Sequence, residues 1–159
     1  MSNTVTNIEG TGIRSKGKGN LKGNFEQIPH SIFNYMKLGL ISGNDLGVYL
    51  FLLKNDNDKQ GYAFPTTKQI AIETGISDKT VKLSTKRLAE VGLIRKEKAP
   101  NYPNKNIYYV LLPLTKEVLY KKVPHLVKVV EQKEKKYESE AEHELQRLDD
   151  YNKQRQEVG

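Results

Sequence analysis

Residues 65–94 of the chain are PTTKQIAIETGISDKTVKLSTKRLAEVGLI. A helix-turn-helix needs a small residue in its first helix, a residue that tolerates positive φ in the turn, and a buried aliphatic residue in its second helix. Ala71, Gly75 and Val81 supply these three in order, at offsets of four and ten residues from Ala71 that are usual for the motif. The stretch therefore predicts two helices joined by a tight turn at Gly75.

Capping residues predict where the helices begin. A Ser, Thr, Asp or Asn side chain at the N-cap accepts a hydrogen bond from the first helical turn, and a suitable residue three positions later completes a capping box. The chain has three such starts. Ser42 with Asp45 predicts a helix over about 43–54, Thr66 with Gln69 predicts one over about 66–74, and Ser77 predicts one over about 78–91. The first of these segments is apolar on nearly all sides, so we expect a buried support helix.

The hydrophobic period changes after Gly92. Residues 93–98 and 106–112 predict two strands, and the Pro- and Asn-rich stretch 99–105 predicts a loop between them. Residues 62–64 suggest a further short strand before Pro65. The expected fold is mainly α with a small β wing.

With that order of elements, the stretch from about 41 to 112 resembles a bacterial winged helix-turn-helix domain. Its segments 65–71, 75–81 and 88–94 are similar to the amino-terminal domains of plasmid and phage replication-initiation and replisome-organiser proteins, and to winged-helix transcription factors. The resemblance implies duplex DNA binding with the third helix in the major groove. Ser84 stands where many such motifs bury an aliphatic residue, so packing there is expected from Thr85, Leu88 or the strands.

Basic residues recur along the third helix at steps of three and four positions, which predicts one cationic face. Lysines so placed can contact phosphates or guanine edges, although a merely solvated helix face has the same pattern. The wing loop is also basic, and an ordinary hairpin loop is its alternative. The expected duplex contacts are Thr66, Lys68, Ser77, Lys79, Thr80, Lys82, Leu83, Lys86 and Arg87 from the helices, Arg95, Lys98, Tyr102, Asn104 and Lys105 from the wing, and Arg14, Lys16 and Lys18 from the amino terminus.

Composition agrees with a nucleic-acid partner. The 26 Lys and Arg against 19 Asp and Glu give a net charge of +7, which attracts polyanions. Residues 1–24 are Gly-rich and basic with few apolar side chains, so they predict a flexible arm or a solubilising leader. We expect three parts: this arm, a DNA-binding domain over 25–112, and a charged helical tail over 113–159.

Several classes of chemistry have little support in the sequence. The chain has no cysteine, which excludes disulfides, thiolate metal sites and a Cys nucleophile. Residues 12–19 have phosphate-loop spacing but end on Gly19 in place of the Ser or Thr that would bind magnesium, and the three histidines are far apart in sequence. No apolar segment is long enough to span a membrane. We expect a cytoplasmic, non-enzymatic protein with no catalytic residues, no bound metal and no cofactor.

Apolar residues recur at helical spacing in the tail, in a narrow stripe on a charged helix: Leu126, Val130, Tyr137, Ala141, Leu145 and Leu148. A lone helix of this kind needs a partner, and a homodimer is favoured over docking on the domain or disorder. Three functions stay open. The first is a sequence-specific DNA-binding protein of a plasmid, phage or other mobile element that acts in replication initiation or transcriptional regulation. The second is an architectural or partition protein that coats DNA, and the third is an accessory factor that docks a relaxase or helicase, with residues 113–159 as the binding site for a replication or conjugation protein.

Overall fold

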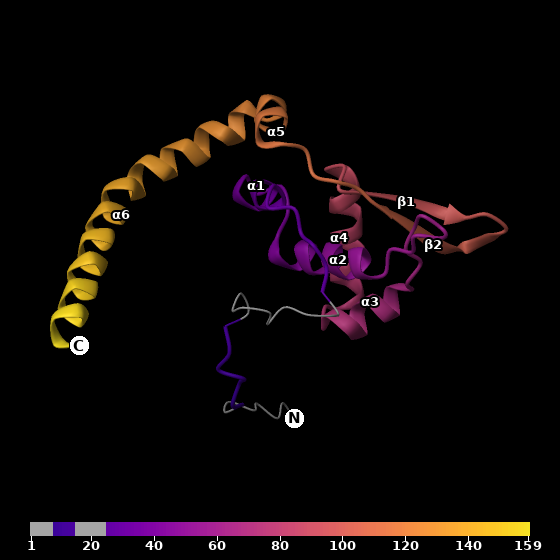
Figure 1. Cartoon of the computed structure of the whole chain (residues 1–159). Coiled ribbons are helices and arrows are strands. Elements are labelled where there is room, and N and C mark those ends of the chain that lie inside the picture. Colours follow the sequence, from indigo (N-terminus) through magenta and orange to yellow (C-terminus); the bar gives the residue numbers. More distant parts are fainter. Residues whose placement is uncertain (1–7, 15–24) are drawn as a thin grey trace.

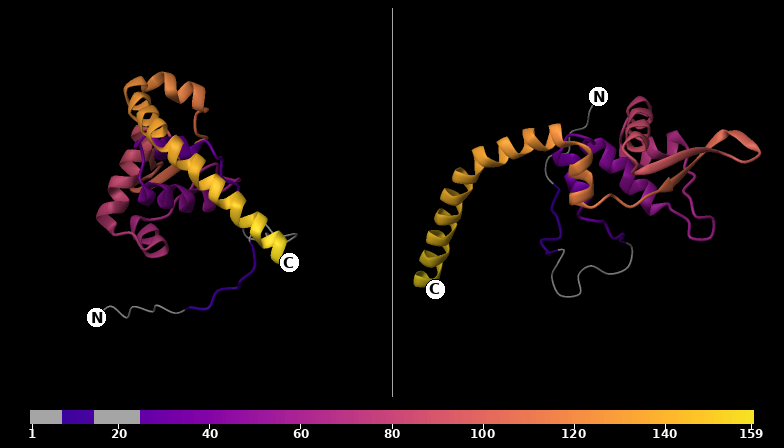
Figure 2. Two further views of the ribbon diagram at one scale, coloured as in Figure 1. Left: turned by 90° about the vertical axis from the view of Figure 1, so that its left-hand side faces the viewer. Right: turned by 90° about the horizontal axis from the view of Figure 1, so that it is seen from above.

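The computed structural model describes residues 8–14 and 25–159 of the chain. A helical body carries a β wing on one side and a long helix that extends away on the other (Figures 1 and 2). The elements are α1 (Ile32–Lys37), α2 (Gly43–Lys54), α3 (Thr67–Thr74), α4 (Asp78–Glu90), β1 (Ile94–Ala99), β2 (Tyr102–Val110), α5 (Lys116–Lys122) and α6 (Pro124–Val158). None of the helices in the described ranges is long and apolar enough to cross a membrane.

The caps place the starts of α2, α3 and α4 as the sequence predicts. Complete capping boxes begin α2 and α3, and the Ser77 side chain accepts a hydrogen bond from the Thr80 N–H at 3.2 Å to begin α4. Gly75 ends α3 with φ of 71°, the left-handed conformation that the turn requires. Val81 is buried on the inner side of α4. The predicted helix-turn-helix is confirmed.

Helix α1 was not expected, because residues 25–40 have no capping signal. Its N-cap, Ser31, makes no side-chain cap bond, and the helix is held instead by the burial of Ile32 and Tyr35. The Tyr35 hydroxyl also accepts a hydrogen bond from the Leu114 N–H at 2.9 Å. Tertiary contacts with residues far along the chain therefore stabilise α1.

The wing is an antiparallel pair, β1 with β2, and its second strand begins earlier than expected. The second strand begins at Tyr102 rather than at Asn106, so the predicted loop 99–105 is wrong. Ala99 pairs with Tyr102 while Lys98 pairs with Asn106, and residues 103–105 form a bulge. Only Pro100 and Asn101 form the turn, with Asn101 at φ of 66°. The predicted third strand is reduced to two isolated bridges, Tyr62 with Asn57 and Ala63 with Tyr108.

The core extends beyond residue 112, so the expected boundary between domain and tail does not coincide with an edge of the core. Leu119 of α5 and Val130 of α6 are buried in the same cluster as α1, α2 and α4. An ion pair between Lys37 and Glu134 adds a surface contact between α1 and α6. From residue 131 onward every side chain of α6 is exposed, and the helix extends away from the body (Figure 1).

Candidate nucleic-acid interface

One face of α4 is basic and exposed. Lys79, Lys82 and Lys86 are all exposed, and Leu83 between them is 49% exposed. The opposite face, with Val81 and Leu88, is buried. Burial of the apolar face therefore fixes which side of α4 turns outward, and the three predicted lysines lie together on it.

Cap bonds engage several of the predicted contact residues at the helix starts. Ser77 donates from its hydroxyl to the Thr80 hydroxyl oxygen at 2.9 Å, besides accepting from the Thr80 backbone N–H. Thr66 accepts from the Gln69 N–H at 3.1 Å to begin α3, and Lys68 is exposed in its first turn. Ser77, Thr80 and Thr66 thus have structural roles at the amino-terminal ends of the two helices.

A hollow of about 640 Å³ separates α4 from the base of the wing. Lys82 and Lys86 line it from α4, and Lys96 lines it from β1. Burial lowers the pKa of Lys96, and repulsion from Lys98 and Lys82 lowers it further. Glu90 of α4 also lines the hollow, so among the described residues three cations face one carboxylate there, and this excess of positive charge attracts an anion.

Lys96 was missing from the expected contacts, although strand alternation indicates its direction. Side chains two residues apart in a strand lie on the same face. Ile94 is buried, so Lys96 and Lys98 lie on the face of the wing that carries Ile94, beside α4. Counting every second residue from the buried Ile94 would have placed Lys96 on the face beside α4.

Arg95, which was expected among the duplex contacts, follows the same alternation. Its side chain lies on the other face of the wing, where its Nε donates to Glu97 Oε1 at 2.8 Å and its guanidinium lies 4.1 Å from the centroid of the Tyr109 ring. Both contacts hold the guanidinium on the side of the sheet away from α4. Arg95 is therefore not part of the basic surface formed by α4 and Lys96.

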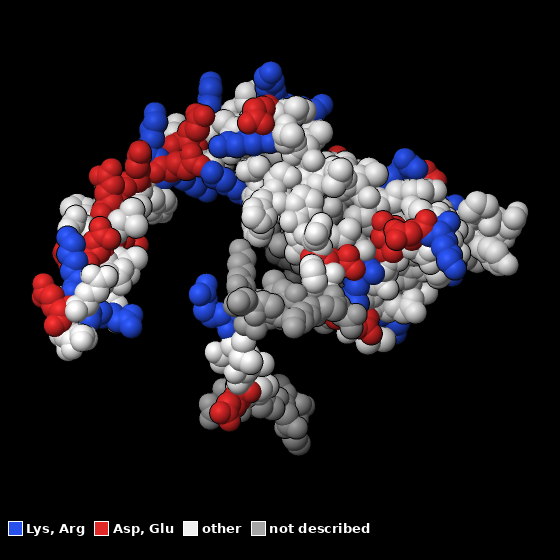
Figure 3. All heavy atoms as spheres, viewed as in Figure 1, with Lys and Arg blue, Asp and Glu red and all other residues white. Residues whose placement is uncertain are grey.

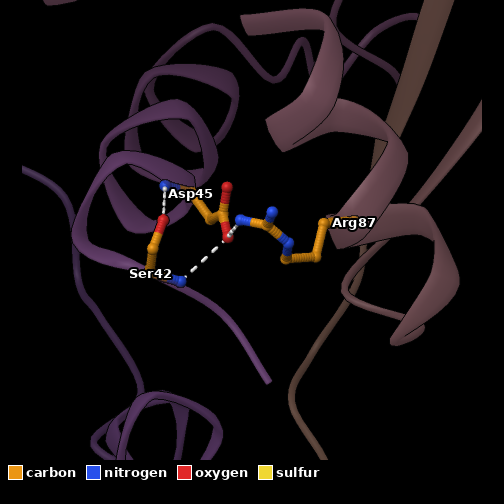
Figure 4. A network of polar contacts seen from close by, with 3 residues as sticks. All are labelled: Ser42, Asp45 and Arg87. Carbon is orange, nitrogen blue, oxygen red and sulfur yellow. Dashed lines mark hydrogen bonds and ion pairs between the residues drawn. The ribbon is translucent and has the colours of Figure 1, made fainter. Parts of the chain in front are cut away.

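Arg87, another expected duplex contact, faces α2 and pairs with a carboxylate there. Its Nη1 donates to Asp45 Oδ2 at 2.8 Å, and the same oxygen accepts from the Ser42 N–H at 2.8 Å (Figure 4). Burial alone would raise the pKa of Asp45, but the neighbouring Ser84 side chain, the Ser42 N–H and Arg87 outweigh it and lower that pKa. Ser84 is buried beside this carboxylate, which explains a polar residue where an aliphatic one was expected.

The wing tip brings three more predicted residues near α3. Tyr102, Asn104 and Lys105 lie at the start of β2 and in its bulge, and they line a hollow of about 400 Å³ together with Thr66 and Thr67. Tyr102 is 69% exposed. The bulge thus turns the basic wing tip toward the start of α3.

Of the three amino-terminal residues expected to contact DNA, only Arg14 lies within the described part of the chain. Arg14 is exposed in a segment without helix or strand, and Lys16 and Lys18 lie outside the described residues. The contribution of the amino-terminal arm to duplex binding stays a prediction.

A match to a family model agrees with the helix-turn-helix part of the fold. Residues 38–94 match a protein family described as "Helix-turn-helix domain". No curated protein sequence matches the chain significantly. Among solved structures, one titled "Crystal Structure of MarR" is similar at 19% identity, over 81% of this chain and 89% of that chain, with a TM-score of 0.36. The helix-turn-helix of α3 and α4 and the wing of β1 and β2 together form a winged helix-turn-helix domain, a class of domain that binds DNA.

Proposed function

We propose that this chain binds duplex DNA with α4 in the major groove and the wing beside it. The observation that carries the proposal is the exposed face of Lys79, Lys82 and Lys86, flanked across a hollow by Lys96. Lysines in this arrangement meet phosphates and guanine edges, and the bulged wing tip reaches the flanking backbone. The chain acts by binding rather than by catalysis, in the cytoplasm.

The biological role follows from the resemblance in sequence. A plasmid, phage or similar mobile element is the proposed source, and replication initiation or transcriptional regulation is the proposed process. Footprinting separates these roles from an architectural one, because a sequence-specific protein protects one short site whereas a coating protein protects DNA cooperatively along its length.

Salt dependence tests the electrostatic basis of binding. About 5 to 8 Lys and Arg side chains are expected to displace counterions, at a slope of about −0.9 in log K against log salt for each phosphate contacted. Titrations at several salt concentrations measure this slope. Absence of binding at low salt, or an affinity independent of salt, removes the proposal.

Two lysine variants test the orientation of α4. Lys82→Ala and Lys86→Ala should each weaken duplex binding and leave the melting temperature almost unchanged, because both side chains are exposed and make no hydrogen bond within the described residues. Lys128→Ala, an exposed lysine on α6, is the matched control and should retain duplex affinity. If Lys128→Ala weakens binding as much as the α4 variants do, the basic surface has been assigned to the wrong element.

The exposed part of α6 supports a second proposal, that two copies of the chain pair through it. Tyr137, Leu145 and Leu148 are each more than half exposed, and α6 carries both signs of charge along its length (Figure 3). A replication or conjugation protein is the alternative partner. Sedimentation of the full chain and of a Leu145→Asp/Leu148→Asp variant tests pairing, since neither side chain is buried in the single chain. A full chain that is monomeric with and without DNA rejects the homodimer.

A further inference from the structure

Aromatic side chains gather on the face of the wing that points away from α4. Tyr62 packs edge-on against Phe64, with ring centroids 6.3 Å apart, and against Tyr109 at 5.8 Å. Phe64 is 38% exposed, and Tyr102 at the wing tip is 69% exposed. The duplex-binding surface of α4 and Lys96 uses none of Tyr62, Phe64 or Tyr109.

Cations cover the ring faces of this cluster. The Lys105 Nζ lies 4.8 Å from the centroid of Phe64, and the Arg95 guanidinium lies 4.1 Å from that of Tyr109. Arg95 is fixed by Glu97, whereas the described residues give Lys105 no ion pair. The ammonium group of Lys105 can therefore leave the Phe64 ring at low cost when another group stacks there.

The rings border a hollow of about 310 Å³ beside the wing tip. Tyr62, Phe64, Tyr102, Lys105 and Ile107 line it, and Gln60 adds an amide. In Figure 3 the wing tip, at the right, presents uncharged side chains with Lys or Arg beside them. The hollow combines flat apolar surfaces, the Lys105 cation and the Gln60 amide, which can both donate and accept hydrogen bonds.

We propose that this hollow binds an unpaired nucleobase of single-stranded DNA. A base stacks on the exposed ring of Phe64 or Tyr102, as bases do on aromatic side chains in proteins that bind single strands. Lys105 moves from the Phe64 ring to the adjoining phosphate, and Gln60 lies within the same hollow to meet the base edge. The described lining residues of the hollow include Lys105 and no carboxylate, and Glu97 on the same face of β1 is paired with Arg95, so the local charge favours an anion. The exposed rings favour an anion that carries planar bases over an acidic protein segment.

The site adjoins the proposed duplex surface and shares two wing-tip residues with it. Tyr102 and Lys105 line this hollow and also the one beside α3, so they stand at the border between the two. A strand that leaves the duplex near the wing passes directly from one to the other. The chain would then hold a double strand and an adjacent opened strand together.

The experiment compares strands with and without bases, using the full chain. Fluorescence anisotropy measures binding to a labelled oligothymidine, to an abasic strand of the same length and to a duplex. The abasic strand has the same phosphates and reports charge attraction alone. Oligothymidine should bind more tightly than the abasic strand, and Tyr102→Ala and Phe64→Ala should each reduce its affinity about 5- to 150-fold toward the abasic level. Tyr102→Phe, which retains a ring, should preserve the affinity.

Lys86→Ala separates this inference from the proposed function. It should weaken duplex binding while leaving oligothymidine binding nearly unchanged. The inference is overturned if the wild-type chain binds oligothymidine and the abasic strand equally. It is also overturned if Tyr102→Ala binds oligothymidine as tightly as the wild type does. If duplex binding persists in either case, the proposed function survives, and a protein becomes the expected partner of the aromatic face. Because Tyr102 is exposed, its variants should keep the wild-type melting temperature. A loss of affinity in these variants is then not caused by unfolding.

Discussion

Replacement of Asp45 by alanine should destabilise the fold far more than replacement of an exposed carboxylate. Asp45 is fully buried and joins two helices, since it completes the capping box of α2 and accepts from Arg87 of α4 (Figure 4). A hydrogen bond to a charged group contributes about 1.5–3 kcal/mol, and a helix cap contributes about 1 kcal/mol. Relief from burying the carboxylate offsets part of this sum. We expect Asp45→Ala to lower the free energy of unfolding by about 2–4 kcal/mol.

Urea unfolding and thermal melting measure this change. For a chain of this size, each kcal/mol corresponds to a shift of about 2–4 °C, so the melting temperature should fall by roughly 4–16 °C. Glu134→Ala is the matched control, because Glu134 also pairs with a cation, Lys37, but both side chains are about half exposed. Exposed pairs contribute little, so this variant should melt close to the wild type. Equal effects of the two variants would refute the idea that the buried pair joins α2 to α4.

The pH dependence gives a second measure of the same contact. The pKa of Asp45 is lowered in the folded chain, so the folded state favours the ionised carboxylate. That stabilisation is present above the ordinary carboxyl pKa of about 4 and is lost as the pH falls through the lower, folded value. Wild type and Asp45→Asn should therefore differ in stability at neutral pH and converge in acid. A difference that grows on acidification contradicts the sign of the shift.

Three further predictions follow from single positions. Lys96→Ala should weaken duplex binding and reduce the salt slope by about 1, whereas Arg95→Ala on the opposite face of β1 should not, as titrations of both variants will measure. Val81→Asp should abolish the cooperative unfolding transition, because it places an unpaired carboxylate in the core. In urea unfolding, Gly75→Ala should lower the free energy of unfolding by about 1 kcal/mol, because Gly75 has a positive φ. Gly47→Ala within α2 should raise it by about 0.5–1 kcal/mol, because the added Cβ would lie 3.6 Å from the Ile76 side chain, which is an ordinary contact.

Local signals account for the parts of the fold that could be predicted from the sequence. Capping bonds join residues three positions apart, so Ser42, Thr66 and Ser77 indicate helix starts without knowledge of the tertiary structure. Helix α1 has no such signal and depends on burial of Tyr35, whose hydroxyl meets a backbone group 79 residues away. Propensity within a short window contains no information on that contact.

The wing shows the limit of composition as a guide. Prolines and asparagines between 99 and 105 favoured a loop, yet a two-residue turn suffices because Asn101 adopts positive φ. The extra residues enter a bulge within the ladder. Composition thus identified the irregular segment correctly, but it did not indicate that part of this segment belongs to the strand that pairs with β1.

The orientation of α4 connects the core with the candidate interface. Successive residues of a helix are separated by about 100°, so a rotation that turned Lys82 and Lys86 inward would also expose Val81 and separate Arg87 from Asp45. Apolar contacts tolerate small rotations, whereas the bond from Arg87 to a buried carboxylate is directional. Arg87, although it faces away from the lysines, thus helps to decide where they point. Its removal should therefore weaken duplex binding by loosening the orientation of α4.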